Sequence, residues 1–341
     1  MNTLQLIFVL IIGVVIHDGG RFLIGRILGA KVEEYDLFFE PKLIRFDVGD
    51  TAYVIGALPF GGKTYFYGAD FLDESQYKSP YAYLNLSIWK RFLIAIGGSI
   101  SLLFITLLML AVVFTRGFSV TTMKVDSVDI GSPAYQSGIH PGDEILALNE
   151  NKVNKWQEFI QAVEFSGGKE LNLEVKRNGQ ILTFVISPQG STETPRLEQK
   201  SNFILGLMPY TFTEKHNLNT ALELSLREIW QMFSDLLLLP MRLIISSTPT
   251  VNIYLSPVSR LGGNYAIVVL SCTLFVSLAF FNLFPFRGLC GEEVLFLLLE
   301  VFLRKPVDIS QRAVFSAIAM FIFTLLIVSI NIVVAILNTT N

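Results

Sequence analysis

The sequence has little charge and few cysteines, and each shortage narrows the classes of protein it can encode. Only 16% of its 341 residues are charged and 52% are hydrophobic, which excludes an ordinary soluble protein and predicts an integral membrane protein. The net charge of −3 and the lack of a basic block give no reason to expect nucleic acid as a partner. The two cysteines, Cys272 and Cys290, lie in or beside apolar segments, which argues against a disulfide framework.

Apolar stretches long enough to cross a bilayer, which takes about 20 residues at helical rise, occur four times. They run from Leu4 to Ala30, Phe92 to Thr115, Tyr265 to Pro285 and Ala313 to Leu337. The first stretch lacks a basic N-terminal region and is interrupted by charge, so we expect a retained helix rather than a secretory signal. The sequence therefore predicts a multi-spanning α-helical membrane protein with four transmembrane helices, in two core halves at 1–117 and 264–341.

Lysine and arginine residues are placed in the connections between spans one and two and between spans three and four. The positive-inside tendency predicts that both connections are cytoplasmic. Both termini and the long region between spans two and three then face the other side. In a bacterium this describes a multi-pass protein of the inner membrane, with the inserted region on the non-cytoplasmic side and the lipid bilayer as its first partner.

Two further segments are predicted to lie at the membrane. Residues 51–68 alternate apolar with small or polar residues around a Leu-Pro-Phe-Gly-Gly turn, which predicts a membrane-associated β-hairpin. That hairpin is either a plain surface feature or an edge strand that pairs with an extended peptide. Residues 211–263 predict a linker with an amphipathic interfacial helix from Asn219 to Leu239, because the charges there argue against a full span.

Residues 118–210 carry the pattern of an inserted α+β module. Ser132-Pro133-Ala134 predicts the start of a short helix, and Asn178-Gly179 predicts a tight hairpin turn. The order of these elements resembles a PDZ domain of the bacterial protease type. The resemblance implies a peptide-binding loop and strand that capture an extended chain or a C-terminus by strand addition. Its residues are Phe203, Ile204, Leu205, Gly206 and Leu207. The alternative is a structural spacer with an empty groove.

The first span contains Ile16-His17-Asp18-Gly19-Gly20-Arg21, which has the form of a zinc-hydrolase helix without its metal chemistry. In the pattern His-Glu-x-x-His, two imidazoles four residues apart share a helix face and bind one zinc, while the Glu activates water. Here Asp18 replaces the Glu, and Arg21, a permanent cation, replaces the second His.

A second segment, from Phe281 to Glu293, follows the third span. Together with the first helix, the hairpin and the single inserted module, it resembles the site-2 protease family of intramembrane zinc metalloproteases over nearly the whole chain. In that family the segment resembles Asn-x-x-Pro-x-Pro-x-Leu-Asp-Gly, whose Asp is the third zinc ligand. Here Arg287 replaces the second Pro and Cys290 replaces the Asp. A third family element, Gly-Pro-x-x-Asn, has become Gly98-Ser99-Ile100-Ser101-Leu102.

These departures predict that no catalytic set works at the degenerate positions His17, Asp18, Arg21 and Cys290, and that no cofactor is bound, although zinc is the family's metal. A cation inside the bilayer needs a partner in the bundle interior, so we expect Arg21 to occupy the space of the metal. Its expected partners are Asp18, Glu292 and Glu293. His17 and Cys290 remain as residual candidates for metal ligands.

Two functions follow from this sequence. The favoured one is a pseudoprotease without zinc or proteolysis, which takes part in regulated intramembrane proteolysis by binding envelope or transmembrane clients. It would hold their C-termini in the PDZ groove or their spans in the membrane cleft. The alternative is an active intramembrane zinc metalloprotease with an atypical metal site. Purified protein that contains about one tightly bound zinc per chain would favour this alternative. Whether the chain is an enzyme stays open on the sequence alone.

Overall fold

The computed structural model describes residues 3–69, 79–190, 203–245, 265–286 and 288–304, with further single positions between 312 and 325. The chain forms two compact units, one made of 1–115 with 216–341 and the other of 116–215. Most of the expected fourth span and the end of the expected 211–263 linker lie outside the described residues.

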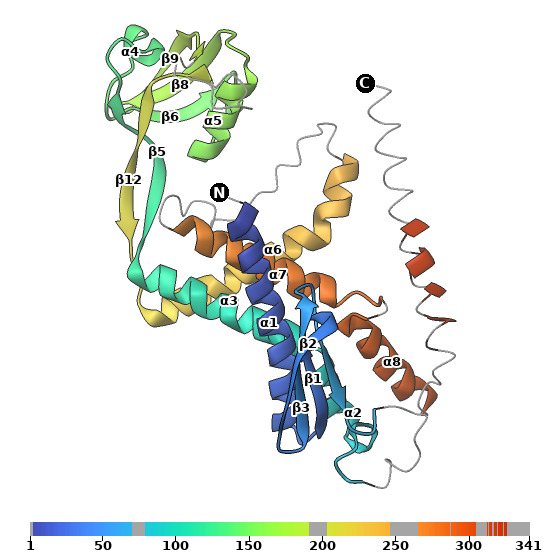
Figure 1. The fold of residues 1–341 in the computed structure, drawn as a ribbon. Helices are drawn as coiled ribbons and strands as arrows, with labels where there is room; N and C mark the ends of the chain where they lie inside the picture. Colours follow the sequence, from blue (N-terminus) through green and yellow to red (C-terminus); the bar gives the residue numbers. More distant parts are fainter. Residues whose placement is uncertain are drawn as a thin grey trace. The chain divides into compact units, whose positions relative to one another are not determined.

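The first unit opens with two long apolar helices, α1 (Thr3–Ile27) and α3 (Gly97–Arg116), drawn in Figure 1. Both are long and apolar enough to cross a membrane. The second predicted span is wrong at its start, because α2 (Ile88–Ala95) ends before Ile96 and α3 begins at Gly97. The break lies where the chain passes α1, since a Cβ on Gly97 would stand 3.2 Å from Ile24 Cδ1.

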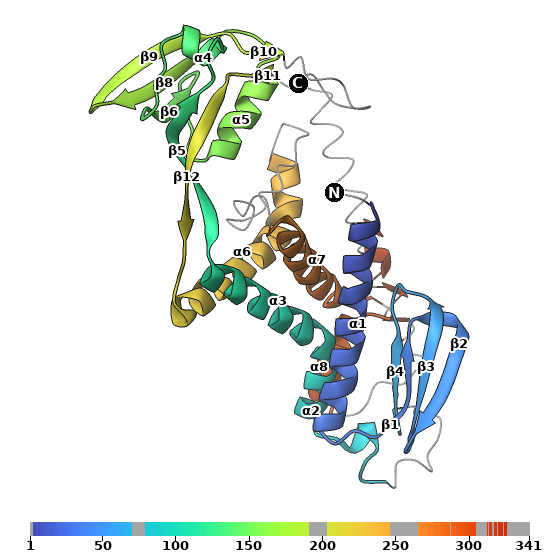
Figure 2. The same cartoon turned by 60° about the vertical axis from the view of Figure 1, so that its left-hand side comes forward.

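A four-stranded sheet lies beside α1 (Figure 2). The predicted hairpin over residues 51–68 is wrong, because its two strands belong to this sheet without pairing with each other. Its strands are β1 (Val32–Leu37), β2 (Phe39–Val48), β3 (Thr51–Leu58) and β4 (Lys63–Phe66), in the order β2-β3-β1-β4. β1 lies between β3 and β4, parallel to the first and antiparallel to the second, so these two strands are not a hairpin. The tight hairpin is instead β2–β3, closed at Gly49 with φ +62°. The edge strands are β2 and β4.

Three further helices complete this unit. α6 (Leu218–Ile245) matches the predicted amphipathic helix: it buries Ala221, Ser225 and Met232 and exposes Leu226 and Trp230. α7 (Ala266–Asn282) is apolar, and its 17 residues are fewer than the third predicted span. α8 (Cys290–Leu303) is a separate helix that the sequence does not predict, because the third predicted span ends at Pro285.

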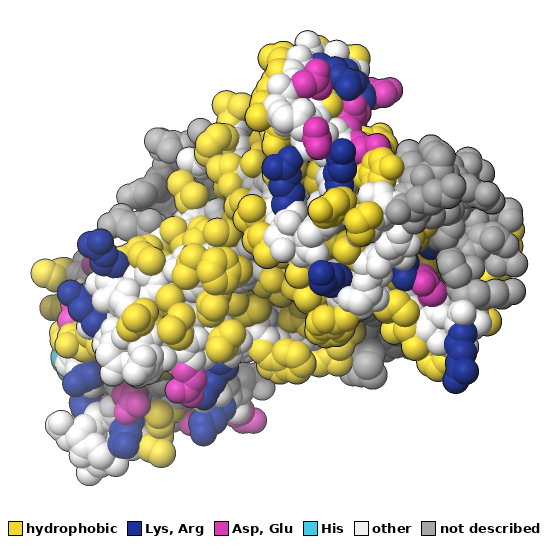
Figure 3. Space-filling model, turned by 90° about the horizontal axis from the view of Figure 1, so that it is seen from below, with side chains coloured by type: hydrophobic (Ala, Val, Ile, Leu, Met, Phe, Trp, Pro, Cys, Tyr) yellow, Lys and Arg dark blue, Asp and Glu magenta, His cyan; other side chains and the backbone are white. Residues whose placement is uncertain are grey.

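The helices α1, α3 and α7 share one core. Val9, Leu102, Phe275 and Ala279 from these helices are buried against one another. Gly13 allows the close approach of α7, since a Cβ there would meet the ring of Phe275 at 3.1 Å. Large apolar side chains remain exposed on the outer surfaces, and hydrophobic side chains cover much of the face in Figure 3. Such a surface suits a lipid environment.

The second unit is an α+β module built on a sheet in the order β12-β5-β6-β8-β9. The strands of this sheet are β5 (Phe118–Val128), β6 (Glu144–Leu148), β8 (Leu171–Arg177), β9 (Gln180–Ile186) and β12 (Leu207–Glu214), and the short β7 (Asn151–Lys152) pairs with β6. The smaller elements are α4 (Pro133–Gln136), α5 (Trp156–Phe165), β10 (Gln189–Gly190) and β11 (Phe203–Ile204). The unit extends beyond the predicted 118–210 because β12 pairs with β5 as far as Glu214 opposite Phe118.

The local predictions for the module are confirmed. Ser132 caps α4 by accepting a hydrogen bond from Tyr135 N at 3.2 Å. The β8–β9 hairpin turns at Asn178 and Gly179, both with positive φ, as a tight turn of this kind requires. The core is apolar, with Leu173 and Val175 of β8 fully buried against Phe159 and Val163 of α5.

Candidate functional site

The family positions on α1 lie in the interior of the first unit, where His17 and Asp18 form one contact. His17 Nδ1 lies 3.0 Å from Asp18 Oδ1, and the two side chains are only 12% and 11% exposed. The second carboxylate oxygen, Oδ2, is buried and has no partner among the described residues. It lies toward the sheet, because a Cβ on Gly62 would stand 2.8 Å from it. Asp18 therefore orients the imidazole, and the ion pair of Arg21 is made with another residue.

Arg21 lies one helical turn further and is held by α8. Its Nη2 donates to Glu293 Oε2 at 2.5 Å, with the two side chains 25% and 21% exposed. The Tyr83 hydroxyl donates to the other oxygen of Glu293. Of the three carboxylates expected around Arg21, Glu293 is the one in contact, while Glu292 accepts from Gly288 N at 2.8 Å. The cation is thus neutralised by a residue of a helix absent from the sequence-based prediction.

Cys290 opens α8 and faces the other nitrogen of the imidazole. Its Sγ lies 3.4 Å from His17 Nε2, and the residue is 2% exposed. Cys290, His17 and Asp18 thus form a chain of contacts from thiol to imidazole to carboxylate. In such a chain the thiol and the imidazole could bind a metal, or the thiol could be activated as a nucleophile. Burial argues against the second use, since reactive thiols sit in partly exposed sites.

Two glycines that the sequence analysis did not single out for this role make the arrangement possible. A Cβ on Gly98 of α3 would stand 2.4 Å from His17 Nε2, so any side chain there would displace the imidazole. A Cβ on Gly20 would stand 2.0 Å from Ser101 Oγ, which brings α1 and α3 into close contact. Both positions of α3 belong to the degenerate third family element, so its remaining glycine keeps a packing role.

A second buried ion pair lies on α8 one heptad beyond Glu293. Arg91 of α2 donates to both oxygens of Glu300, at 3.0 and 2.5 Å, and the two side chains are 4% and 11% exposed. Nothing in the sequence pattern points to this pair, because Arg91 lies in a basic connection where a solvent-exposed cation is expected. Two arginines from different helices therefore fix α8 through two of its carboxylates.

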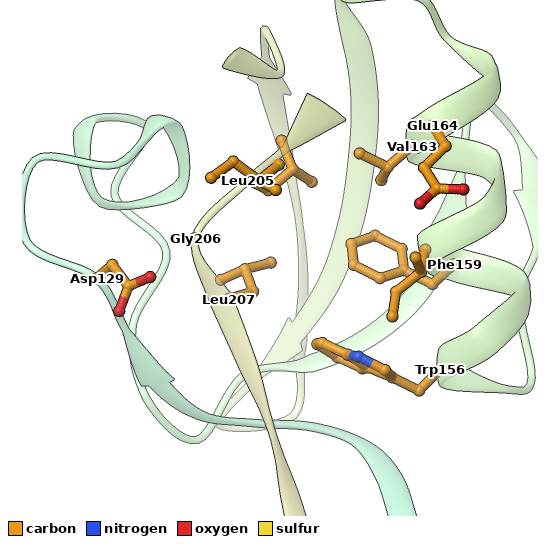
Figure 4. Close-up of a pocket in the computed structure, with 10 residues that line it drawn as sticks. Asp129, Trp156, Phe159, Val163, Glu164, Leu205, Gly206 and Leu207 are labelled. Carbon is orange, nitrogen blue, oxygen red and sulfur yellow. The ribbon is translucent and has the colours of Figure 1, made fainter. Parts of the chain in front are cut away.

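The module carries a pocket of about 270 Å³ between α5 and the segment 204–207 (Figure 4). The predicted residues Ile204, Leu205, Gly206 and Leu207 line it, and Phe203 precedes them in β11. The opposite wall is made by Trp156, Phe159, Ile160, Val163 and Glu164 of α5, and Asp129 completes the lining. β12 is an edge strand of its sheet, so an extended peptide has room to pair with it.

Comparison with known proteins relates the chain to a family of peptidases. The model of Peptidase family M50 matches residues 5–338. A protein of Clostridium perfringens named a putative zinc metalloprotease is 26% identical over 86% of this chain and 86% of its own length. One of Clostridium acetobutylicum with the same description is 26% identical over 94% and 93%. The Metalloprotease MmpA of Caulobacter vibrioides is 24% identical over 92% and 89%.

One solved structure also aligns with the chain. The PDZ domain of an SdrC-like protein from Listeria monocytogenes is 21% identical and covers 26% of this chain and 85% of its own, with a TM-score of 0.21. A TM-score at that level carries no argument about the fold. The family match, in contrast, spans nearly the whole sequence, and the chain belongs to Peptidase family M50, the site-2 protease family of membrane proteins.

This result corrects the expectation that no cofactor is involved. The relatives are named zinc metalloproteases, so zinc is the metal that the family implies. The residues at the family positions do not fit it as a complete set. His17 and Cys290 supply two ligands, whereas a catalytic zinc takes three protein ligands and a water. Within the described part of the chain, no group of three or more His, Cys, Asp or Glu residues could hold a metal ion.

Proposed function

We propose that this member of the site-2 protease family is a pseudoprotease of the bacterial inner membrane. It holds envelope or transmembrane clients through the inserted module, which we take as a PDZ domain on the non-cytoplasmic side, and it does not cut them. The single observation that carries the loss of proteolysis is the ion pair between Arg21 and Glu293, because it occupies the helix turn where the family has its second imidazole.

Peptide hydrolysis requires an activated water and stabilisation of the developing oxyanion. In this chain the carboxylate in the place of the general base is shorter by one methylene, and its Oδ1 is engaged with His17. Arg21 is a permanent cation paired with Glu293, so it cannot take a proton from water. The second oxygen of Asp18, Oδ2, is buried toward Gly62 of the sheet. Within the described residues, the side chains at the family positions therefore form no complete set of general base and metal ligands.

Client binding is supported by the pocket between α5 and the segment 204–207 and by the unpaired edge of β12. A peptide added to that edge gains main-chain hydrogen bonds along the strand, while the pocket takes one of its side chains. The edge strands β2 and β4 of the other sheet offer a second place for an extended segment of a client. Binding without cleavage would let the protein sequester or present clients of an active relative.

The proposal is tested with the purified full chain in detergent, supplied with zinc and mixed with a model transmembrane substrate that has an unstructured segment. We expect no new fragments. The triple variant Asp18→Glu, Arg21→His and Cys290→Asp is the positive arm, because it restores the family's ligands and base, and we expect it to bind zinc and yield fragments.

Cleavage by the unaltered chain that a chelator stops would refute the proposal. In the triple variant Glu293 has lost its arginine partner and remains as an unpaired carboxylate. A quadruple variant that adds Glu293→Gln removes this charge and serves as the control. If neither triple nor quadruple variant binds zinc, the alignment of the α8 segment with the family motif is wrong, and the argument from Arg21 falls with it.

A second candidate function is zinc-dependent proteolysis at an atypical site. It is favoured by the distance of 3.4 Å between Cys290 Sγ and His17 Nε2, since both atoms are legitimate zinc ligands, and by the names of the relatives. A third ligand would have to come from a rearranged carboxylate such as Glu292. Zinc content of the purified chain near one per molecule, lost in Cys290→Ser but kept in Cys272→Ser, would establish this candidate over the first.

A further inference from the structure

The pocket of the module has a mostly apolar lining, and the charged residues in that lining are acidic. Seven of its lining residues are aromatic or aliphatic, and its floor includes Phe159, Val163 and Leu205, which are almost fully buried. The only two charged residues among those that line it are Asp129 and Glu164. No lysine or arginine is among them, so the two formal charges at the pocket are both negative.

The two carboxylates stand on opposite sides of the peptide-binding segment. Asp129 follows the end of β5, and Glu164 lies in the last turn of α5, with residues 205–207 between them (Figure 4). Both residues are exposed. Within the described residues, neither carboxylate forms a salt bridge with a cation. A peptide that pairs with this segment and places one side chain in the pocket would bring the side chains two residues away, on the same face of the extended chain, toward one or both carboxylates.

The backbone fixes these positions. Gly206 has φ +75°, and a Cβ there would lie 2.2 Å from Ser132 Cβ, so the segment passes close to the α4 cap. Asp129 N donates to Gly206 O at 2.9 Å and Ala134 N donates to Leu205 O at 3.0 Å. These bonds hold Asp129 beside the binding segment, so its carboxylate stays near the pocket.

We propose, on the premise that the module binds client peptides, that the pocket selects an extended segment with one large apolar side chain and a lysine or arginine two residues away. Residues two apart lie on the same face of an extended chain. The apolar side chain fills the space above Phe159 and Leu205, and the cation on the same face meets Glu164 or Asp129. An acidic flank at the same place is disfavoured, because like charges repel across a short distance. The two carboxylates thus determine which peptides are preferred, and burial of the apolar side chain in the pocket supplies affinity.

The test uses the full chain in a neutral detergent and short labelled peptides with amidated C-termini, read by fluorescence anisotropy. One peptide carries a central Leu with Lys two residues to either side, a second carries the same Leu with Glu at those two positions, and a third has Ser in place of Leu with the Lys residues kept. We expect the first to bind about tenfold more tightly than the second, as two exposed ion pairs allow. The third should bind weakly, and high salt should reduce the first difference.

The variant Asp129→Asn with Glu164→Gln should bring the Lys and Glu peptides to within about twofold of each other, while the matched control Glu170→Gln, on an exposed residue outside the pocket, should leave the preference unchanged. Equal affinity of the two peptides for the unaltered chain, or a preference that survives the double variant, overturns the charge selection but leaves client binding standing. Failure of every peptide to bind, also when the same sequences carry a free C-terminal carboxylate, overturns the proposed client binding as well.

Discussion

The first unit (1–115 with 216–341), here called the membrane unit, and the inserted module (116–215) differ in how their charged residues are placed. In the membrane unit, Arg21 and Arg91 each meet a carboxylate of α8, and the pairs are largely withdrawn from solvent. At the pocket of the module, Asp129 and Glu164 lie exposed beside an apolar cavity. A charge that is already paired inside a bundle positions helices, whereas an exposed charge beside a pocket can select a partner. This contrast explains why we assign recognition to the module and not to the family site.

The largest expected effect comes from breaking the pair Arg91–Glu300. Arg91→Met leaves Glu300 buried without a counter-charge, which should reduce stability by about 3–5 kcal/mol. Thermal unfolding in detergent measures the loss. The double variant Arg91→Met with Glu300→Leu should recover most of it, since replacing both partners by apolar groups removes the unpaired charge. A double variant as unstable as the single one would show that the pair does not act as a buried ion pair.

A smaller effect is expected at the charged pair of the module. Asp143 is 1% exposed, and its carboxylate accepts from Arg177 Nε and Nη2, both at 2.7 Å, and from His140 N at 3.0 Å. Burial of the carboxyl opposes ionisation, but the hydrogen bonds from Arg177 and His140 outweigh it and lower the pKa of Asp143. Asp143→Asn removes a charge-assisted bond and should cost the module about 1.5–3 kcal/mol.

The same pair predicts a pH dependence. Because folding lowers the pKa of Asp143, its contribution is fully present above the pKa of the unfolded carboxyl, about 3.9, and is lost as the pH falls through the folded value. Stability of the module, followed by the fluorescence of Trp156 in a chain whose Trp89 and Trp230 are replaced by Phe, should therefore fall in acid more steeply in the parent than in Asp143→Asn. Parallel acid curves would contradict the assignment.

Close packing at the family site predicts an effect of intermediate size. Gly20→Ala introduces a Cβ 2.0 Å from Ser101 Oγ, and we expect overpacking to cost about 1–3 kcal/mol. Gly19→Ala is the matched control, since its Cβ would meet only Tyr35 Oη at 3.7 Å and alanine favours a helix. Thermal unfolding of both variants distinguishes them. Equal stability would mean that α1 and α3 separate at low cost.

The smallest effect is expected on the outer surface of α6. Arg227 and Glu223 form an i,i+4 pair at 3.6 Å, with both side chains about 70% exposed. Arg227→Ala should change stability by about 0.3–0.5 kcal/mol, near the limit of detection. Thermal unfolding in detergent measures the change, and a loss as large as that of Arg91→Met would show that the pair is not solvent-exposed on α6.

The sequence determined the features that local pattern fixes. Helical apolar runs predicted α1, α3 and α6, and turn chemistry at Asn178-Gly179 predicted the β8–β9 hairpin. The positions His17, Asp18 and Arg21 could be read from their spacing on one helix. Cys290 and the family itself followed from the resemblance of the whole layout to the site-2 proteases.

Tertiary structure alone decided which of these groups meet. The parallel pairing of β1 with β3 overturned the predicted hairpin, since alternation along one strand carries no information about its neighbour. The sequence offered three carboxylates as partners of Arg21, and the packing of α8 against α1 selected Glu293 from among them, 272 residues away in the chain. A sequence lists charges, but a buried charge is satisfied only by a group that the packing of helices brings within hydrogen-bond distance.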